Sequence, residues 1–560
     1  PINWLRFVML VSPEQKPVDG QQTEAQKDFE RMDGWFKQSP DCAGNYMDGT
    51  SAGCTTTWEY RRDHLYAFSD PLMYQTGVNR PCGNGMASVI RTMDAYRKRY
   101  FDKLTFGNVW ASNRMFPMCM ALDVPGYESS RWSDLPYADY YRAAAYHKPG
   151  LYLNYFRIGQ QLDTREGGER FFRYATAYGI FPSIGRFTDE AYEKFGDLQH
   201  LYIPIIKRLF RAGWEPETYA TTNDPAIRVE RFGRALNVHY FTVLNPTGNP
   251  RVVKLTLEGA AFPVWAADLP DRDLAAVEMS TSAALPLQRS GEGWTTSVPL
   301  GPQDVAVVAL MPQTSLGTWY RGRARELLEG ASYVYASTPS TNATALLAKQ
   351  VPAVAKKLTP AQTARRTNEI IGAVSALDLA SASLPDDLKR RSYRRDLAEA
   401  QRLLTEALLA DAGVEVGWMG QPGAAMDGQV SLSPWLMERT VRMTGGGPPE
   451  TTAVKMLGSV RERLVEPEVA TMVQAPQTPL TLGLEDRAKS AVTALATISF
   501  KDAAGQSHDL QRRGYAYFGA ISELTATYEP ASGALAVRLR NADVRPRQFD
   551  LALSAATGLQ

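Results

Sequence analysis

Residues 87–112 read ASVIRTMDAYRKRYFDKLTFGNVWAS and predict a helix followed by a strand. In the first part, Val89, Met93 and Tyr96 recur at roughly helical spacing, which is typical of an amphipathic helix. The second part, Leu104–Ser112, is a short apolar run with the composition of a strand. A helix that leads directly into a strand indicates an α/β arrangement in this part of the chain.

The same alternation extends over residues 1 to about 225 and predicts a parallel sheet, either open and doubly wound or closed as a (β/α) barrel. Two features favour the barrel: no G-x-G-x-x-G turn follows the first apolar run, and polar residues follow several strands instead of one. A complete barrel needs about 250 residues, so we expect one that lacks its first strands. The strand-like runs are Ile2–Leu10, Gly44–Asp48, Leu104–Ser112, Met118–Val124, Gly150–Phe156 and Gly179–Ser183.

The chain has 560 residues and is too long for a single core, and composition divides it into four predicted domains. Residues 1–225 are the (β/α)-barrel catalytic-like domain. Residues 226–312 are an antiparallel β-sandwich, in which residues 238–245 and 251–257 should form a hairpin. Residues 315–412 are rich in Ala, Leu and Arg and predict a helical bundle. Strand patterns return in residues 417–560 and predict a second β-sandwich. The fold class is therefore multidomain α/β plus all-β.

Charge and composition exclude several classes of function. The 61 basic and 60 acidic residues leave a formal charge of +1, so no overall field indicates nucleic acid as a partner. No apolar run has the length of about 20 residues that a membrane-spanning helix needs. The five histidines are scattered without paired spacing, so no metal is expected, and nothing predicts another cofactor. Cys42 and Cys54 flank Asp48, and a disulfide between them would brace that turn, although free thiols are the alternative.

Two acidic turns carry the functional prediction. Asp48 ends the strand-like run Gly44–Asp48 and precedes Gly49. Asp123 and Glu128 form the second acidic turn, at the end of the run Met118–Val124. Hydrolysis of a glycosidic bond needs one carboxyl group to protonate the departing oxygen and another to attack the sugar or activate water. We therefore predict Asp48 as the nucleophile or base and Glu128 as the proton donor, with Asp123 as the alternative donor. Asp and Glu are also common in ordinary turns, which is the alternative interpretation of either residue alone.

Aromatic and polar residues near these turns are candidates for substrate binding. Aromatic rings stack on sugar faces, while Arg, His and Asn side chains donate hydrogen bonds to hydroxyl groups. The candidates are Trp58, Tyr60, Arg61, Arg62, His64, Trp110, Asn113 and Tyr127.

The order of several short motifs resembles large secreted glycoside-hydrolase-like barrel proteins of α-galactosidase-like organisation. The motifs are Tyr46-Met47-Asp48-Gly49, Tyr60-Arg61-Arg62-Asp63-His64, Asp70-Pro71-Leu72, Asn113, Leu122-Asp123-Val124-Pro125-Gly126-Tyr127-Glu128 and Tyr178-Gly179-Ile180-Phe181-Pro182-Ser183. The resemblance covers about 310 residues, because the stretch from Arg231 to Leu310 is similar to the β-sandwich that follows such barrels. It implies a carbohydrate substrate, a pair of carboxylates at strand ends and an extracellular or periplasmic location.

Three functions remain open at this point. The first is a glycoside hydrolase that acts on the O-glycosidic bonds of an oligo- or polysaccharide. The second is a catalytically silent barrel that binds carbohydrate or serves in the cell envelope. The third is a lyase or transglycosylase that also uses carboxylates. Convergence of the Asp48 and Glu128 carboxyl groups on one cleft would favour an enzyme over a binding protein.

Overall fold

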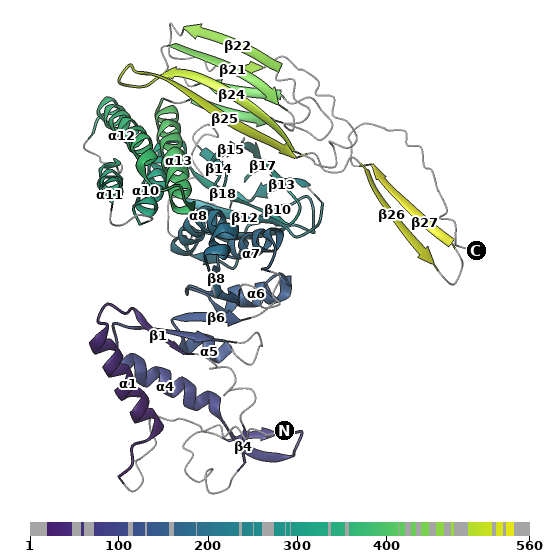
Figure 1. Cartoon of the computed structure of the whole chain (residues 1–560). Helices are drawn as coiled ribbons and strands as arrows, with labels where there is room; N and C mark the ends of the chain where they lie inside the picture. Colours follow the sequence, from purple (N-terminus) through teal and green to yellow (C-terminus); the bar gives the residue numbers. More distant parts are fainter. Residues whose placement is uncertain are drawn as a thin grey trace. The chain divides into compact units, whose positions relative to one another are not determined.

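The computed structural model describes residues 20–47, 58–60, 72–109, 116–128, 131–155, 162–185, 188–233, 238–249, 251–259, 274–285, 287–291, 293–333, 338–352, 358–412, 414–419, 427–432, 438–446, 455–463, 472–474, 491–517, 522–529 and 534–541. The chain divides into two compact units, Pro1–Pro216 and Glu217–Gln560. Figure 1 shows the elements of both units in order along the chain.

Unit 1 is built around a parallel sheet in the order β1-β5-β6-β7-β8. Its strands are β1 (Gly44–Met47), β5 (Leu104–Asn108), β6 (Val124–Glu128), β7 (Leu151–Tyr155) and β8 (Phe181–Gly185). Helices separate most successive strands, and neighbours in the sheet follow one another along the chain, except for a small insertion after β1. This confirms the predicted α/β character and the parallel sheet.

The helices of unit 1 are α1 (Glu24–Gln38), α4 (Gly85–Arg99), α5 (Phe116–Ala121), α6 (Leu135–Ala144), α7 (Arg165–Ala177) and α8 (Asp189–Ala212). Thr164 and Thr188 cap α7 and α8 by accepting a hydrogen bond from a backbone N–H of the first turn. The insertion after β1 is an antiparallel sheet of β2 (Trp58–Glu59), β4 (Arg80–Asn84) and β3 (Met73–Gln75), in that order. A short strand, β9 (Trp214–Glu215), ends the unit.

Aromatic side chains hold helices against one face of the parallel sheet. The ring of Tyr127 in β6 stacks on Tyr141 in α6 at a centroid distance of 4.3 Å. Tyr152 in β7 contacts Tyr141 at 5.9 Å and Phe171 in α7 at 6.1 Å. These four rings are fully buried, so α6 and α7 cover this face by apolar burial.

Two expectations for unit 1 are wrong. Residues 118–124 are not one strand, because residues 116–121 form α5 and the strand begins at Val124. The residues read as an acidic turn, Val124–Glu128, are strand β6 itself. The run Ile2–Leu10 lies outside the described residues.

Unit 2 begins with two antiparallel sheets. One has the order β10-β13-β17-β16 and the other includes β15-β14-β18-β12-β11. Their inner faces share one buried apolar core that contains Phe241, Leu255, Leu300 and Val308. The strands are β10 (Ala220–Thr222), β11 (Arg228–Phe232), β12 (His239–Asn245), β13 (Arg251–Leu257), β14 (Leu274–Glu278), β15 (Ala283–Leu285), β16 (Gln288–Ser290), β17 (Gly293–Leu300) and β18 (Asp304–Pro312).

The predicted hairpin in this region is wrong, because β12 and β13 belong to different sheets. β12 pairs with β11 and β18, whereas β13 pairs with β10 and β17. The turn residues between them therefore carry the chain from one sheet to the other. Asn245 holds this crossing, since its side-chain amide donates to the carbonyl oxygens of Asn249 and Gly301, both at 2.7 Å.

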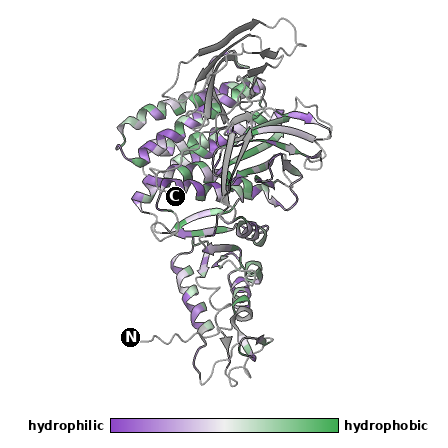
Figure 2. Ribbon diagram, turned by 90° about the vertical axis from the view of Figure 1, so that its right-hand side faces the viewer, coloured by the Kyte–Doolittle hydropathy of each residue, from purple (hydrophilic) through white to green (hydrophobic). Residues whose placement is uncertain are grey.

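Among the residues that the structure describes here, four helices follow, each with hydrophobic and hydrophilic residues (Figure 2). They are α10 (Leu316–Ser332), α11 (Pro339–Gln350), α12 (Pro360–Ala380) and α13 (Leu388–Asp411), with short 3-10 turns at η4 (Gln313–Ser315) and η5 (Ser381–Ser383). A partly buried ion pair, Arg321–Asp411, joins α10 to α13. The hydroxyl groups of Thr344 and Tyr393 share a buried hydrogen bond of 2.7 Å between α11 and α13.

Antiparallel strands complete unit 2 in the sheet orders β19-β20-β23, β22-β21-β24-β25 and β26-β27. They are β19 (Val414–Met419), β20 (Asp427–Leu432), β21 (Glu438–Gly446), β22 (Lys455–Arg463), β23 (Met472–Gln474), β24 (Ala491–Lys501), β25 (Ser507–Tyr517), β26 (Ser522–Glu529) and β27 (Ala534–Asn541). No helix in the described ranges is both long enough and apolar enough to cross a membrane.

Candidate active site at the carboxyl edge of the parallel sheet

Glu128 and Asn108 meet at the carboxyl edge of the parallel sheet. Glu128 is the last residue of β6, and Asn108 is the last residue of the neighbouring strand β5. The side-chain amide nitrogen Nδ2 of Asn108 donates to Oε2 of Glu128 at 2.5 Å. Asn108 is only 3% exposed, whereas Glu128 is half-buried, so the carboxylate lies at the surface end of this pair. Parallel-sheet enzymes place their reacting groups at this edge.

The register explains why the two side chains meet. Asn108 pairs with Gly126, and Glu128 is two residues beyond Gly126 on the same strand, so both side chains lie on one face of the sheet. Gly126 itself has no side chain, and a Cβ there would be 2.6 Å from Cε2 of Phe106 and 3.0 Å from Cδ1 of Leu153. The ring of Phe106 and the Leu153 side chain therefore fill the space beside Gly126 and form an apolar floor next to the Asn108–Glu128 pair.

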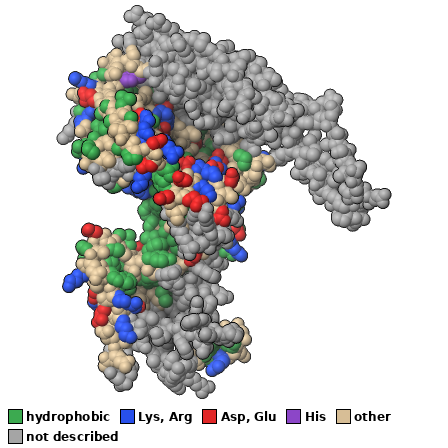
Figure 3. Space-filling model, in the orientation of Figure 1, with side chains coloured by type: hydrophobic (Ala, Val, Ile, Leu, Met, Phe, Trp, Pro, Cys, Tyr) green, Lys and Arg blue, Asp and Glu red, His purple; other side chains and the backbone are tan. Residues whose placement is uncertain are grey.

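Aromatic side chains continue this face toward β1. Tyr46 pairs with Phe106 across β1 and β5, and the two ring centroids are 4.7 Å apart. Tyr46 is 44% exposed. Hydrophobic side chains also gather on the face of unit 1 that Figure 3 shows. The floor beside the pair is thus suited to apolar or stacking contacts with a ligand.

Asp123 lies at the other end of β6. It immediately precedes the strand, and its carboxylate accepts from the backbone N–H of Thr105 at 2.7 Å and from the Thr105 hydroxyl at 2.8 Å. Arg97 Nη2 donates to it at 3.1 Å. Although burial opposes it, hydrogen bonding to Thr105 and the charge of Arg97 lower the pKa of Asp123. This environment does not suit the alternative proton donor that Asp123 was expected to be.

Lys148 reinforces the same amino edge of the sheet. Its ammonium group donates to the carbonyl oxygens of Cys119, Met120 and Leu122 at 2.8, 2.8 and 2.6 Å. These carbonyls are at the end of α5, where the chain turns into β6. Burial lowers the pKa of Lys148. Lys148 therefore stabilises the turn from α5 into β6 and has a structural role.

The structure buries Tyr127, a predicted substrate-binding residue, on the helix-covered face of the sheet. Tyr127 is adjacent to Glu128 in β6, but successive side chains in a strand point to opposite faces, and Tyr127 points into the helix-covered face. It is fully buried, and its hydroxyl donates to the Tyr141 carbonyl at 3.1 Å. Burial raises the pKa of Tyr127 well above its usual value. The ring has no surface left for a ligand.

The other predicted binding residues are only partly described. Trp58 is in β2 of the small antiparallel sheet, and Tyr60 follows that strand with its ring 5.8 Å from the guanidinium carbon of Arg80. Neither belongs to the parallel sheet. The remaining candidates lie outside the described residues and stay predictions: Asp48, Arg61, Arg62, His64, Trp110 and Asn113.

Asn108 is the site residue that the sequence prediction missed. The sequence prediction took the whole apolar run from Leu104 to Ser112 as a strand, so that Asn113 was the polar residue expected after it. In the structure, β5 ends at Asn108. The sequence did contain a sign of this earlier strand end, because Asn108 is the amide residue within the apolar run LTFGNVWAS. A polar residue inside such a run is a reason to end the strand there.

The described cysteines are all free thiols. Cys42 is an exposed free thiol, Cys82 and Cys119 are free and buried, and Cys54 lies outside the described residues. Burial raises the pKa of Cys119 to about 11. Within the described ranges, no three His, Cys, Asp or Glu side chains gather as a metal site.

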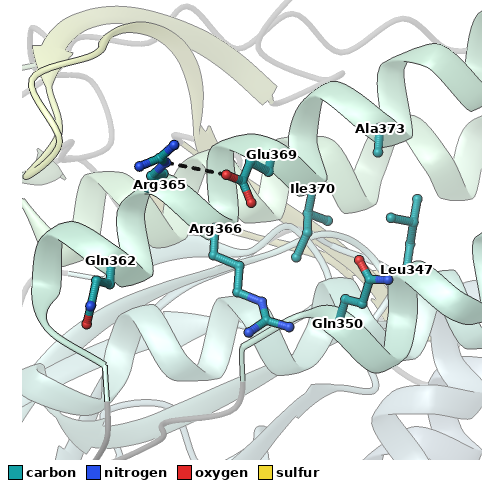
Figure 4. Close-up of a pocket in the computed structure, with 8 residues that line it drawn as sticks. All are labelled: Leu347, Gln350, Gln362, Arg365, Arg366, Glu369, Ile370 and Ala373. Carbon is teal, nitrogen blue, oxygen red and sulfur yellow. Dashed lines mark ion pairs between the residues drawn. The ribbon is translucent and has the colours of Figure 1, made fainter.

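A pocket of about 490 Å³ lies between α11 and α12 in unit 2 (Figure 4). Leu347 and Ile370 form part of its wall, and Arg365 and Arg366 come from the first turns of α12. Glu369 is the acidic residue among those that line it, and it pairs with Arg365 at 3.5 Å. A single paired carboxylate does not provide the two acids that glycoside hydrolysis needs.

Comparison with known proteins gives weak matches. No protein-family profile and no curated protein matches the chain. Among solved structures, α-galactosidase I from Mortierella vinacea is similar, with 11% identity and a TM-score of 0.27 over 40% of this chain and 62% of that chain. A GH27 β-L-arabinopyranosidase from Geobacillus stearothermophilus has 12% identity and a TM-score of 0.21 over 42% of this chain and 65% of that chain.

A putative α-galactosidase/melibiase from Bacteroides fragilis has 9% identity and a TM-score of 0.20, over 42% of this chain and 68% of that chain. The matches thus span less than two thirds of the first two structures. At these TM-scores, an assignment of activity must rest on the side chains of this chain itself.

Proposed function

We propose that the chain is a glycoside hydrolase that cleaves O-glycosidic bonds of an oligo- or polysaccharide with Asp48 and Glu128. The observation that supports this proposal best is the half-buried Glu128 carboxylate at the carboxyl edge of a parallel sheet, next to the Asn108 amide. In sequence, Asp48 directly follows Met47, the last residue of β1. β1 and β6 are both neighbours of β5, so both acids belong to one edge of the sheet in this proposal.

The strand order supports a (β/α) barrel as the frame for this chemistry. In a barrel, parallel strands that follow one another along the chain are also neighbours in the sheet, as they are here. In a doubly wound sheet, the strand order reverses at a switch point. We extend the proposal to the remaining domains, with a β-sandwich at 226–312, a helical bundle at 315–412 and a second β-sandwich at 417–560 as accessory modules. A polysaccharide substrate fits an extracellular or periplasmic location.

Activity against a panel of aryl glycosides tests the proposal directly. We expect the wild-type chain to release the aryl alcohol from at least one sugar. Asp48→Asn and Glu128→Gln should each lower kcat by several orders of magnitude with little change in stability, because each keeps the shape and removes the charge. Asp123→Asn is the matched control, since it changes an acid at the other end of β6.

The outcomes separate the three functions left open by the sequence. Binding of oligosaccharides without release of any aryl alcohol would support the silent carbohydrate-binding protein. An unsaturated or transferred sugar product would support a lyase or transglycosylase. Turnover at the wild-type rate in Asp48→Asn and Glu128→Gln would contradict the carboxylate pair.

A further inference from the structure

We propose that Asn108 is a positioning residue that donates to the Glu128 carboxyl group and orients it, so that Glu128 acts as the base or nucleophile and not as the proton donor. This inference rests on the proposed function and reverses the roles expected from the sequence. It concerns two described residues, Asn108 and Glu128, that share a hydrogen bond.

The direction of the hydrogen bond is the first argument. Asn108 Nδ2 donates to Glu128 Oε2 at 2.5 Å. An N–H donor stabilises the ionised carboxyl group more than the protonated one, and a hydrogen bond to a charged acceptor is roughly twice as strong as a neutral one. The contact therefore favours the form of Glu128 that attacks a carbon or accepts a proton.

The surroundings of the pair hold its geometry. Asn108 is 3% exposed and belongs to a strand with hydrogen-bonded neighbours on both sides, so its amide group is held in place. Phe106 and Leu153 flank Gly126 on the same face and keep the site apolar on that side. In a medium of low dielectric constant, a hydrogen bond to a charge is stronger than in water.

The geometry also orients Glu128. Because Oε2 accepts from Asn108, Oε1 is the oxygen that this bond leaves for a ligand. In the reaction, the bond from the anomeric carbon to the departing oxygen breaks, and that oxygen takes a proton from the other acid. Glu128 either forms a bond to the anomeric carbon, which water later cleaves, or takes the proton of the attacking water. Asp48 is then the candidate for the proton donor.

The hydrogen bond can be tested without any substrate. In protein labelled with ¹⁵N on asparagine side chains, the Asn108 amide signal is identified by its loss in Asn108→Leu, or in Asn108→Asp if the first variant does not fold. We expect this signal to shift in Glu128→Gln and to stay in place in Asp123→Asn. An Asn108 signal that does not respond to Glu128→Gln would overturn the inference, whatever the activity.

Leaving-group dependence tests the role of Glu128. A missing proton donor slows phenyl glycosides far more than dinitrophenyl glycosides, because the dinitrophenolate leaves without protonation. We expect Glu128→Ala to lose activity on both to a similar extent, and Asn108→Leu to lose about 100-fold on both, since it misplaces Glu128. Asn154→Leu is the matched control: Asn154 is equally buried and is the last residue but one of β7, the strand next to β6, but in register it lies on the opposite face.

The outcomes separate this inference from the proposed function. If Glu128→Ala keeps its activity on the dinitrophenyl substrate alone, Glu128 is the proton donor, and the role assigned here is wrong while the hydrolase proposal stands. If the wild-type chain cleaves no glycoside in the panel, both the hydrolase proposal and the catalytic role of Glu128 are overturned. Equal losses in Asn108→Leu and Asn154→Leu would show that Asn108 acts on the fold and not on Glu128.

Discussion

The carboxyl groups of Asp123 and Glu128 lie at opposite ends of strand β6, although the two residues are close in sequence. Asp123 precedes the strand and is held by Thr105 and Arg97, whereas Glu128 ends it beside Asn108. The two acids therefore have different tasks. Asp123 fixes the amino edge of the sheet, and Glu128 is available to a ligand at the carboxyl edge.

Asp123→Asn should lower stability without lowering kcat. The substitution removes the charge that Thr105 and Arg97 stabilise, and we expect the free energy of unfolding to fall by about 1–2 kcal/mol at neutral pH. Because the folded-state pKa of Asp123 is below its usual 3.8, its contribution is complete above about pH 4 and is lost as the pH falls through the folded-state value. Urea unfolding at neutral and acid pH measures the difference.

The gap between wild type and Asp123→Asn should therefore narrow below about pH 4 and close as the pH falls through the folded-state pKa, where the wild-type carboxylate also becomes protonated. A difference in stability that is independent of pH would contradict the electrostatic role of Asp123.

Gly126→Ala should destabilise unit 1. The added Cβ would be 2.6 Å from Cε2 of Phe106, so the ring has to move within a packed face. We expect a loss of about 1–3 kcal/mol in the free energy of unfolding, measured by urea titration. The displaced ring also lies beside the Asn108–Glu128 pair, so activity should fall together with stability.

Gly34→Ala is the control for this substitution. Gly34 lies inside helix α1, and an added Cβ meets no described atom within 4 Å. An Ala there should raise stability by about 0.5–1 kcal/mol, because it restricts the unfolded chain and favours the helix. Loss of stability in both variants to the same extent would show that packing on Phe106 is not the cause.

Much of the α/β unit could be predicted from the sequence, because strands buried in a parallel sheet are short apolar runs between helices. β1, β5 and β7 fall within runs identified in this way, and β8 overlaps the run Gly179–Ser183 but ends two residues later, at Gly185. β6 was misplaced because Pro125 and Gly126 are turn residues by composition, yet both are central in the sheet. Gly126 is needed there by the approach of Phe106, and the sequence alone does not reveal such a contact.

The candidate site was predictable only in part, because it depends on strand ends and on register. Glu128 was identified from its sequence, and its place at the end of a strand was the reason. Asp123 was grouped with it because the residues between them were read as a loop, whereas a strand separates them. The face of each residue is set by the pairing of Asn108 with Gly126, which only the structure provides.

Lys148→Met should destabilise the entry into β6. The variant keeps most of the apolar stem but leaves the carbonyl oxygens of Cys119, Met120 and Leu122 without the ammonium donor. We expect a loss of about 2–3 kcal/mol in the free energy of unfolding. Lys98→Met is the control, because Lys98 is an exposed helix residue that pairs with Asp94, and such pairs contribute at most about 0.5 kcal/mol.

Substitutions of Tyr127 test whether this residue packs the fold or binds substrate. Its neighbour Glu128 faces the site, whereas Tyr127 faces the helices. Tyr127→Phe removes the hydrogen bond to the Tyr141 carbonyl and should cost about 1 kcal/mol, whereas Tyr127→Ala also removes the stacked ring and should cost about 3–5 kcal/mol. Thermal and urea unfolding measure both losses. The KM of Tyr127→Phe should equal that of the wild type, since the ring has no exposed surface. A raised KM in this conservative variant would return Tyr127 to the substrate-binding residues.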